Sequence, residues 1–148
     1  MIKTALFASA ALCIHVAAFA QATPVGLWKT IDDKTQKERS LVRITETAGV
    51  FSGHIEKRLD PSAKPEDVCD KCADDRKDKP IQGLEIIRGV RKSDGDDNRW
   101  DGGTILSPDE GKTYKVRMSP ADGGKKLEVR GYVGAPLLGR TQTWIRVE

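Results

Sequence analysis

The C-terminal stretch TYKVRMSPADGGKKLEVRGYVGAPLLGRTQTWIRV, residues 113–147, contains three short runs of β-prone residues separated by turn sequences. In its middle run, Leu127 and Val129 alternate with Glu128 and Arg130. Successive side chains of a strand point to opposite faces of its sheet, so this alternation predicts a strand with one face toward an apolar interior.

The same pattern extends upstream, and no long apolar stripe of helical period interrupts it. Eight β-prone runs follow one another, at residues 25–30, 40–46, 50–57, 84–91, 99–106, 113–118, 126–133 and 139–147. Most of the segments between them are short and rich in Gly, Asp, Asn and Pro, which predicts an antiparallel meander. Eight such strands with few large apolar residues favour a small closed β-barrel, whose interior holds side chains or one small ligand. A β-sandwich is the alternative.

The first twenty residues differ from the rest of the chain, because 16 of them are hydrophobic and only Lys3 is charged. A positive start, an apolar run from Ala5 to Ala17 and the sequence Ala18-Phe19-Ala20 are typical of a secretory signal. We therefore expect residues 1–20 to be a signal peptide, residues 21–148 to form one barrel domain, and the protein to be exported. In a Gram-negative host it would be periplasmic. No segment of the mature chain is apolar and long enough to span a bilayer as a helix.

Charge and composition exclude several functions. Charged residues make up 32% of the chain, but 25 basic and 22 acidic residues nearly balance and are interspersed. This pattern is typical of a solvated surface and predicts no nucleic-acid binding. Glycines 102, 103 and 111 lack a following helix, so no phosphate-binding loop or cofactor is expected.

The long polar segment 59–82 separates the third and fourth runs and is either an ordered lid or a mobile loop. It contains Cys69 and Cys72, the two cysteines of the expected mature chain. Export and spacing favour a disulfide within the loop. A redox dithiol, free thiols or half of a metal site are the alternatives, but a metal site lacks a second pair of ligands.

Several stretches of the chain resemble a family of exported bacterial proteins known as domain of unknown function 2147. They lie at residues 26–30, 40–44, 53–55, 80–84, 100–103, 111–114, 130–134 and 139–144. The most specific are RGYVG at 130–134 and GRTQTW at 139–144. The resemblance implies a lipocalin-like β-barrel and carries no established activity.

Gly26 and Trp28 near the start, with a late arginine, are similar to the lipocalin signature. There, a tryptophan on the first strand lies against an arginine near the last strand and closes one end of the barrel. The resemblance implies this structural role for Trp28 with either Arg140 or Arg146.

Polar and aromatic residues in the last two runs are the candidate ligand-binding site. They are Arg130, Tyr132, Arg140, Gln142 and Trp144, with Tyr114 and Trp100 as further candidates. If the last run points its even-numbered residues inward, they form a cavity suited to a small anionic or amphipathic ligand. If it points them outward, they form an exposed strip for a partner. Ion pairs that simply fill a narrow barrel are the third alternative.

Catalytic and metal-binding patterns are scarce. A nucleophile-histidine site would need His54, which lies within a predicted strand. Asp94, Asp96 and Asn98 match the start of a calcium loop, but the remaining ligand positions do not, so a hairpin turn is expected. We therefore expect a non-enzymatic binding module for a small ligand or envelope component. A structural or protein-interaction component of the cell envelope, with a filled barrel, is the alternative.

Overall fold

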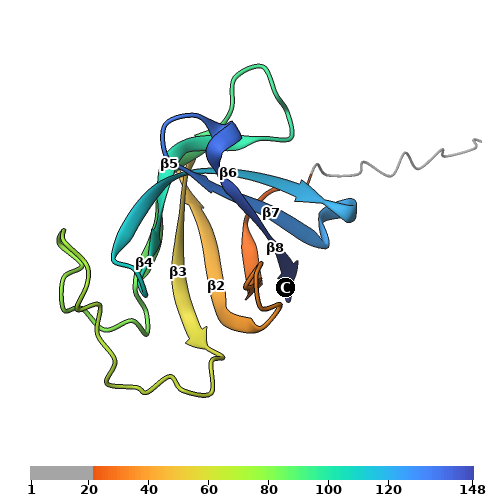
Figure 1. The fold of residues 1–148 in the computed structure, drawn as a ribbon. Coiled ribbons are helices and arrows are strands. Elements are labelled where there is room, and N and C mark those ends of the chain that lie inside the picture. Colours follow the sequence, from red (N-terminus) through yellow and green to blue (C-terminus); the bar gives the residue numbers. More distant parts are fainter. Residues whose placement is uncertain (1–21) are drawn as a thin grey trace, which may run out of the picture.

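The computed structural model describes residues 22–148, so the predicted signal peptide lies outside the described residues. Eight antiparallel strands form a closed barrel in chain order, as predicted (Figure 1). They are β1 (Gly26–Ile31), β2 (Glu38–Thr47), β3 (Val50–Arg58), β4 (Glu85–Lys92), β5 (Trp100–Ser107), β6 (Lys112–Ala121), β7 (Lys126–Tyr132) and β8 (Arg140–Arg146). Two short 3-10 helices were not predicted, η1 (Asp122–Gly124) after β6 and η2 (Pro136–Leu138) after β7. The meander closes where β1 pairs with β8, with Trp28 opposite Arg146.

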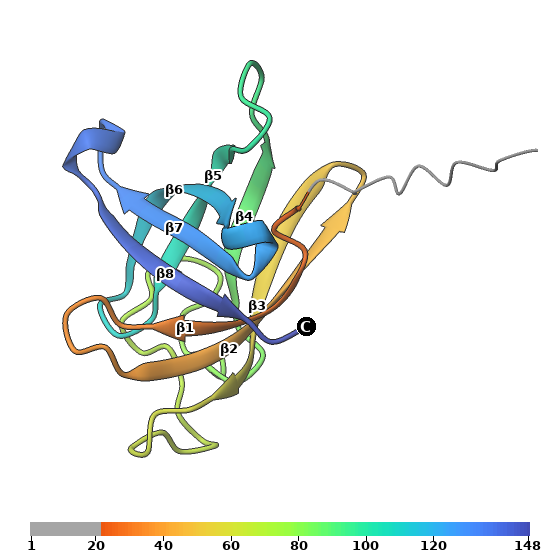
Figure 2. The same ribbon diagram turned by 90° about the vertical axis from the view of Figure 1, so that its right-hand side faces the viewer.

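The two ends of the barrel are built differently (Figure 2). The β1–β2 loop and η2 lie at one end, which we call the open end, whereas the C-terminus lies at the other, the closed end. Large apolar side chains fill the closed half, and they include Trp28, Phe51, Trp100 and Met118, all at most 4% exposed. All six aromatic residues of the expected mature chain lie on strands, as predicted. The three tryptophans among them are at most 2% exposed, so they contribute large side chains to an otherwise limited apolar core.

Arg146 and Trp28 seal the closed end. The Arg146 guanidinium lies 4.2 Å from the centre of the Trp28 ring system and donates to the carbonyl oxygens of Thr23, Val25 and Gly124. Gly26 has a φ of +145°, and a Cβ there would collide with the Arg146 side chain, so glycine permits this approach. Of the two arginines considered from the sequence, Arg146 is thus the one that lies over Trp28.

The long segment between β3 and β4 packs along the open end, and its contacts favour the ordered alternative. Cys69 and Cys72 form a disulfide, as predicted, and both are buried. Arg76 is 4% exposed and donates to the backbone oxygen of Glu85 on β4. Its ion pair with Asp74 holds the pKa of that carboxyl at about 2. A charged group this deep needs such partners, and here they join the loop to the barrel wall.

Residues 93–99, which contain the calcium-loop-like sequence, form the β4–β5 connection, as expected for a hairpin. The Asp96 carboxylate accepts a hydrogen bond from the Asn98 backbone amide at 3.0 Å. The Asn98 side chain donates to the backbone oxygen of Pro120. These contacts are those of an ordinary turn with polar side chains.

Candidate functional site

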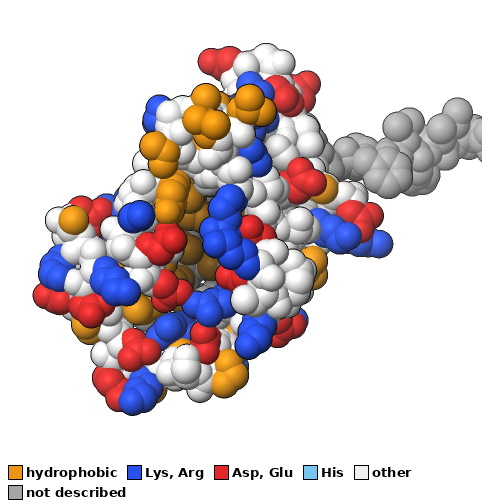
Figure 3. Space-filling model, in the orientation of Figure 1, with side chains coloured by type: hydrophobic (Ala, Val, Ile, Leu, Met, Phe, Trp, Pro, Cys, Tyr) orange, Lys and Arg blue, Asp and Glu red, His pale blue; other side chains and the backbone are white. Residues whose placement is uncertain are grey.

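A cavity of about 460 Å³ opens at the open end of the barrel. Figure 3 shows the hollow from this side, with hydrophobic side chains in its depth and charged side chains around it. The volume exceeds the ~300 Å³ at the lower end of typical small-molecule sites. It therefore disfavours the alternative of a completely filled barrel.

β8 supplies polar and aromatic groups to the cavity wall. Arg140, Gln142 and Trp144 all line the cavity, so the even-numbered face of this strand points inward. Trp144 is 2% exposed, and its indole nitrogen donates to the Gln142 side-chain oxygen at 3.0 Å. Because this bond satisfies the buried indole N–H, the Trp144 ring can form an apolar surface within the cavity.

The depth of the cavity is otherwise apolar. Val42 of β2, Ile55 of β3, Leu106 of β5 and Val129 of β7 line it and are at most 4% exposed. Ile105 of β5 adds a half-buried surface nearer the mouth. Residues from four strands thus provide a hydrophobic surface for the apolar part of a ligand.

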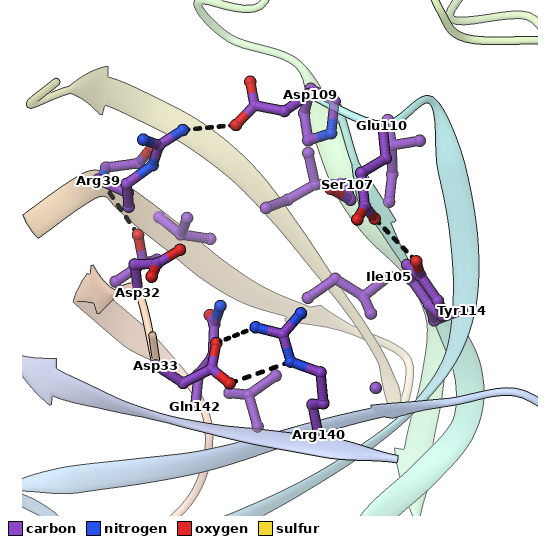
Figure 4. A pocket seen from close by; sticks show the side chains of 18 of the residues that line it. Asp32, Asp33, Arg39, Ile105, Ser107, Asp109, Glu110, Tyr114, Arg140 and Gln142 are labelled. Atoms are coloured by element: carbon purple, nitrogen blue, oxygen red, sulfur yellow. Dashed lines mark hydrogen bonds and ion pairs between the residues drawn. The ribbon is translucent and has the colours of Figure 1, made fainter. Parts of the chain in front are cut away.

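An ion pair crosses the rim between β8 and the β1–β2 loop (Figure 4). Arg140 donates to both carboxylate oxygens of Asp33, at 3.0 and 2.5 Å. These hydrogen bonds lower the pKa of Asp33 and raise the pKa of Arg140. The neighbouring Gln142 side chain lowers the pKa of Asp33 further. The bidentate geometry fixes the position of the Arg140 guanidinium beside the cavity mouth.

Two further arginines at the rim are also paired with carboxylates. Arg39 contacts Asp60 at 2.8 Å and Asp109 at 2.5 Å, and so joins β2 to the β3–β4 and β5–β6 connections. Arg58 contacts Asp67 of the long loop at 2.6 Å. Every arginine that lines the cavity thus already has a negative partner.

Tyr114 and Glu110 add a hydrogen-bonded pair on the β5–β6 side of the mouth. The Tyr114 hydroxyl donates to Glu110 at 2.7 Å. This bond lowers the pKa of Glu110 and raises the pKa of Tyr114. At neutral pH the pair therefore presents an ionised carboxylate and a neutral phenol.

The other predicted ligand-binding residues are placed differently. Tyr132 lies at the rim and lines the cavity, but Arg130 does not. Arg130 belongs to the opposite face of β7 from Val129 and donates to the backbone oxygens of Pro136 and Leu137. Of the further candidates, Tyr114 lines the cavity, whereas Trp100 packs in the closed half against Phe51.

Sequence reasoning missed the acidic half of the rim. Asp33 and Glu110 lie in the segments between the predicted strands, and no motif in the sequence singles them or Arg39 out. Ion pairing across the mouth joins positions 107 residues apart in the case of Arg140 and Asp33. No local spacing marks such a pair, although the clustering of charges in the turns at one end of a predicted meander is a signal that could have found it.

His54, the residue on which a catalytic triad would depend, lies away from this cavity. It is 45% exposed, and its Nε2 is 3.5 Å from a Glu85 carboxylate oxygen. Within residues 22–148, no group of three or more His, Cys, Asp or Glu side chains is arranged to hold a metal ion. The same residues contain no helix of the length and hydrophobicity needed to cross a membrane.

Comparisons with known proteins agree with the resemblance seen in the sequence. Residues 26–146 match the family described as "Uncharacterized protein conserved in bacteria (DUF2147)". Protein HP1028 from the human pathogen Helicobacter pylori, described as belonging to the lipocalin family, has a similar structure, with a TM-score of 0.72. It is 22% identical, and the match covers 86% of this chain and 85% of that one. No curated protein matches the chain significantly.

The family match spans all eight strands, and the structural match supports the barrel. The chain therefore belongs to this bacterial family of uncharacterised proteins and has a lipocalin-like fold.

Proposed function

We propose that the protein binds one small amphipathic molecule in the cavity of its barrel. The observation that carries this proposal is a cavity of about 460 Å³ that is apolar in its depth and lined by charged pairs at its mouth. The apolar part of the ligand would contact Trp144 and its neighbours. Its polar end would lie among the side chains of the rim.

The ion pairs of the rim favour an uncharged or zwitterionic polar end over a simple anion. An anionic ligand that approaches Arg140 must compete with Asp33, which already occupies the guanidinium with two hydrogen bonds. Asp33 and Glu110 are both ionised at neutral pH, because their pKa values are lowered. A free carboxylate would therefore be repelled by these two groups, whereas a zwitterion or a polyol can use both signs of charge.

Export of the protein from the cytoplasm is part of the same proposal. The leader-like sequence of residues 1–20 supports export, and export would place the barrel where amphipathic molecules of the cell envelope are found. Detection of the mature N-terminus at Gln21 in protein isolated from its host would test this part.

Binding is tested by titration with the uncharged fluorescent probe N-phenyl-1-naphthylamine, whose emission rises in an apolar site. The probe should then be displaced by dodecylphosphocholine, which is zwitterionic, at lower concentration than by laurate, which is anionic. Both competitors are kept below their micelle concentrations. Native mass spectrometry of protein from its own host would also reveal a co-purifying molecule.

A matched pair of variants identifies the site. Ile105→Trp adds an indole to the cavity and should weaken probe binding at least about tenfold, because the added ring occupies part of the volume. Thr104→Trp places the same ring on the adjacent residue, which does not line the cavity, and should leave probe binding unchanged. Equal affinities for the two variants would contradict the proposed site, and preference for laurate would contradict the proposed ligand class.

A further inference from the structure

The connection between β7 and β8 is unusual in this highly charged chain. Its sequence, VGAPLLG at residues 133–139, contains no charged or hydrogen-bonding side chain. Val133, Leu137 and Leu138 are 67%, 87% and 78% exposed, the three highest values among the large hydrophobic residues with exposed side chains. We call residues 133–139 the apolar lip. Figure 3 shows hydrophobic side chains beside the hollow, where Figure 1 places η2.

The apolar lip is held in a defined position. The Arg130 guanidinium donates to the backbone oxygen of Pro136 at 2.6 Å, to that of Leu137 at 3.3 Å, and to the Thr141 hydroxyl at 2.8 Å. These bonds connect both strands that flank the lip to the turn of η2. The side chains of Leu137 and Leu138 are therefore held in solvent by an ordered turn. Exposure of two neighbouring leucines does not stabilise the fold, and such exposed apolar patches are typical of interaction sites.

A group of cations lies on the outer wall of the barrel next to the apolar lip. Lys115 of β6 is exposed and pairs with Tyr132, the last residue of β7 before the lip. Arg117, which is partly exposed, pairs with Arg130 on the same ladder, and its buried Nε atom has no hydrogen-bond partner within residues 22–148. Within the same residues, neither Lys115 nor Arg117 forms an ion pair with a carboxylate. This part of the wall therefore carries uncompensated positive charge.

We propose that the apolar lip docks the protein on an anionic lipid surface. Leu137 and Leu138 would enter the apolar region below the headgroups, and Lys115 and Arg117 would face the negatively charged lipids. Apolar insertion combined with adjacent cations is the pairing of forces by which peripheral proteins bind anionic bilayers. A second protein copy explains the cations less well, since like charges would then approach one another.

The lip also borders the cavity, because Val133 and Leu138 line its mouth. Docking by the lip would place the mouth beside the lipid surface. This proposal concerns the outer surface of the β7–β8 connection and does not depend on the cavity being a binding site. If the fluorescent probe fails to bind in the cavity, the lipid-docking proposal still stands. If the lip fails to bind vesicles, the proposal of a ligand in the cavity still stands.

The experiment is flotation of the protein with vesicles of phosphatidylcholine that contain either no phosphatidylglycerol or about 30% of it. Protein recovered from its host is used, and wild type and variants must share the same N-terminal residue by mass. Wild type should float with the anionic vesicles and much less with the neutral ones. The double variant Leu137→Ser/Leu138→Ser should lose binding at least about tenfold, because two leucine side chains no longer leave water.

Two further variants separate the contributions of the lip and the cations. Lys115→Gln/Arg117→Gln should weaken binding to the anionic vesicles and reduce its sensitivity to salt. Val147→Ser changes a half-exposed valine at the closed end and serves as the matched control, with unchanged binding expected. Leu137→Trp gives an independent signal, a blue shift of the added indole's emission when anionic vesicles are mixed in.

Several results would overturn the proposal. These are absence of wild-type flotation, equal flotation with both kinds of vesicle, undiminished binding of the lip double variant, or no blue shift for Leu137→Trp. A wild-type dimer that the lip double variant converts to a monomer would assign the lip to a second copy of the chain and would equally overturn it.

Discussion

The two ends of the barrel each carry an arginine from the same face of β8. Arg146 lies at the closed end and Arg140 at the mouth of the cavity, six residues apart on one strand. At the ~3.3 Å rise of a strand, about 20 Å separates their backbone positions. Residue type, strand and face are shared, so the differences between the two sites come from their neighbours.

Those neighbours give the two arginines opposite properties. Arg146 stacks on Trp28 and donates to neutral carbonyl oxygens, and burial lowers its pKa. Arg140 is 53% exposed and binds a carboxylate, which raises its pKa. The stacked guanidinium covers a fully buried indole ring, whereas an exposed ion pair contributes little net stability and exchanges easily with solvent. The closed end is thus built to seal the barrel, and the rim is built to admit a ligand.

The largest effect should follow from removing the aromatic half of the closed end. Trp28 is fully buried, and its indole nitrogen donates to the Pro24 backbone oxygen at 2.8 Å. Trp28→Ala should lower the free energy of unfolding by about 3–5 kcal/mol, since it leaves a large cavity and removes the surface beneath Arg146. Denaturant unfolding followed by circular dichroism measures this value. A loss below about 1 kcal/mol would show that the closed end is not the main seal.

An intermediate effect on the free energy of unfolding is expected when each of the two arginines is replaced by glutamine in turn. Arg146→Gln should cost about 1.5–3 kcal/mol, because it leaves three backbone oxygens without their charged donor. Arg140→Gln should cost at most about 1 kcal/mol, as for other exposed ion pairs. The same unfolding titration measures both. Equal losses would contradict the distinction between a structural and an exchangeable end.

The fold could be predicted from sequence because local signals agree with the tertiary structure. Alternation on β7 and turn residues between the runs are properties of a few neighbouring residues, and the observed strands differ little from the predicted ones. The sixth run was the main exception, because β6 continues to Ala121 through Pro120. Proline lacks a backbone donor and usually ends a strand, but here it is buried on the inward face.

The site was less predictable because it depends on contacts between distant turns. The inward face of β8 was left open by the sequence, since neither of its faces is purely apolar. Its orientation follows from Trp144 packing in the core, which only the closed topology reveals. Likewise, the partner of Arg140 depends on the approach of the β1–β2 loop to β8 and not on any spacing along the chain.

The smallest effect tests whether the rim ion pair contributes to stability at all. Because the pKa of Asp33 is lower in the folded protein than its ordinary value near 3.9, the ion pair stabilises the fold above that pH. This stabilisation is lost as the pH falls through the folded-state pKa. Asp33→Asn should therefore lower the free energy of unfolding by up to about 1 kcal/mol at pH 7, and the difference from wild type should vanish in strong acid.

Arg140→Gln provides the control for this pH dependence. The double variant Asp33→Asn/Arg140→Gln should be no less stable at neutral pH than the less stable single variant, because each single change already breaks the same pair. Additive losses would instead mean that the two residues act independently. A difference between wild type and Asp33→Asn that persists in strong acid would assign the effect of Asp33 to packing of the β1–β2 loop. In that case the rim would be a structural element like the closed end, and the contrast between the two ends would fail.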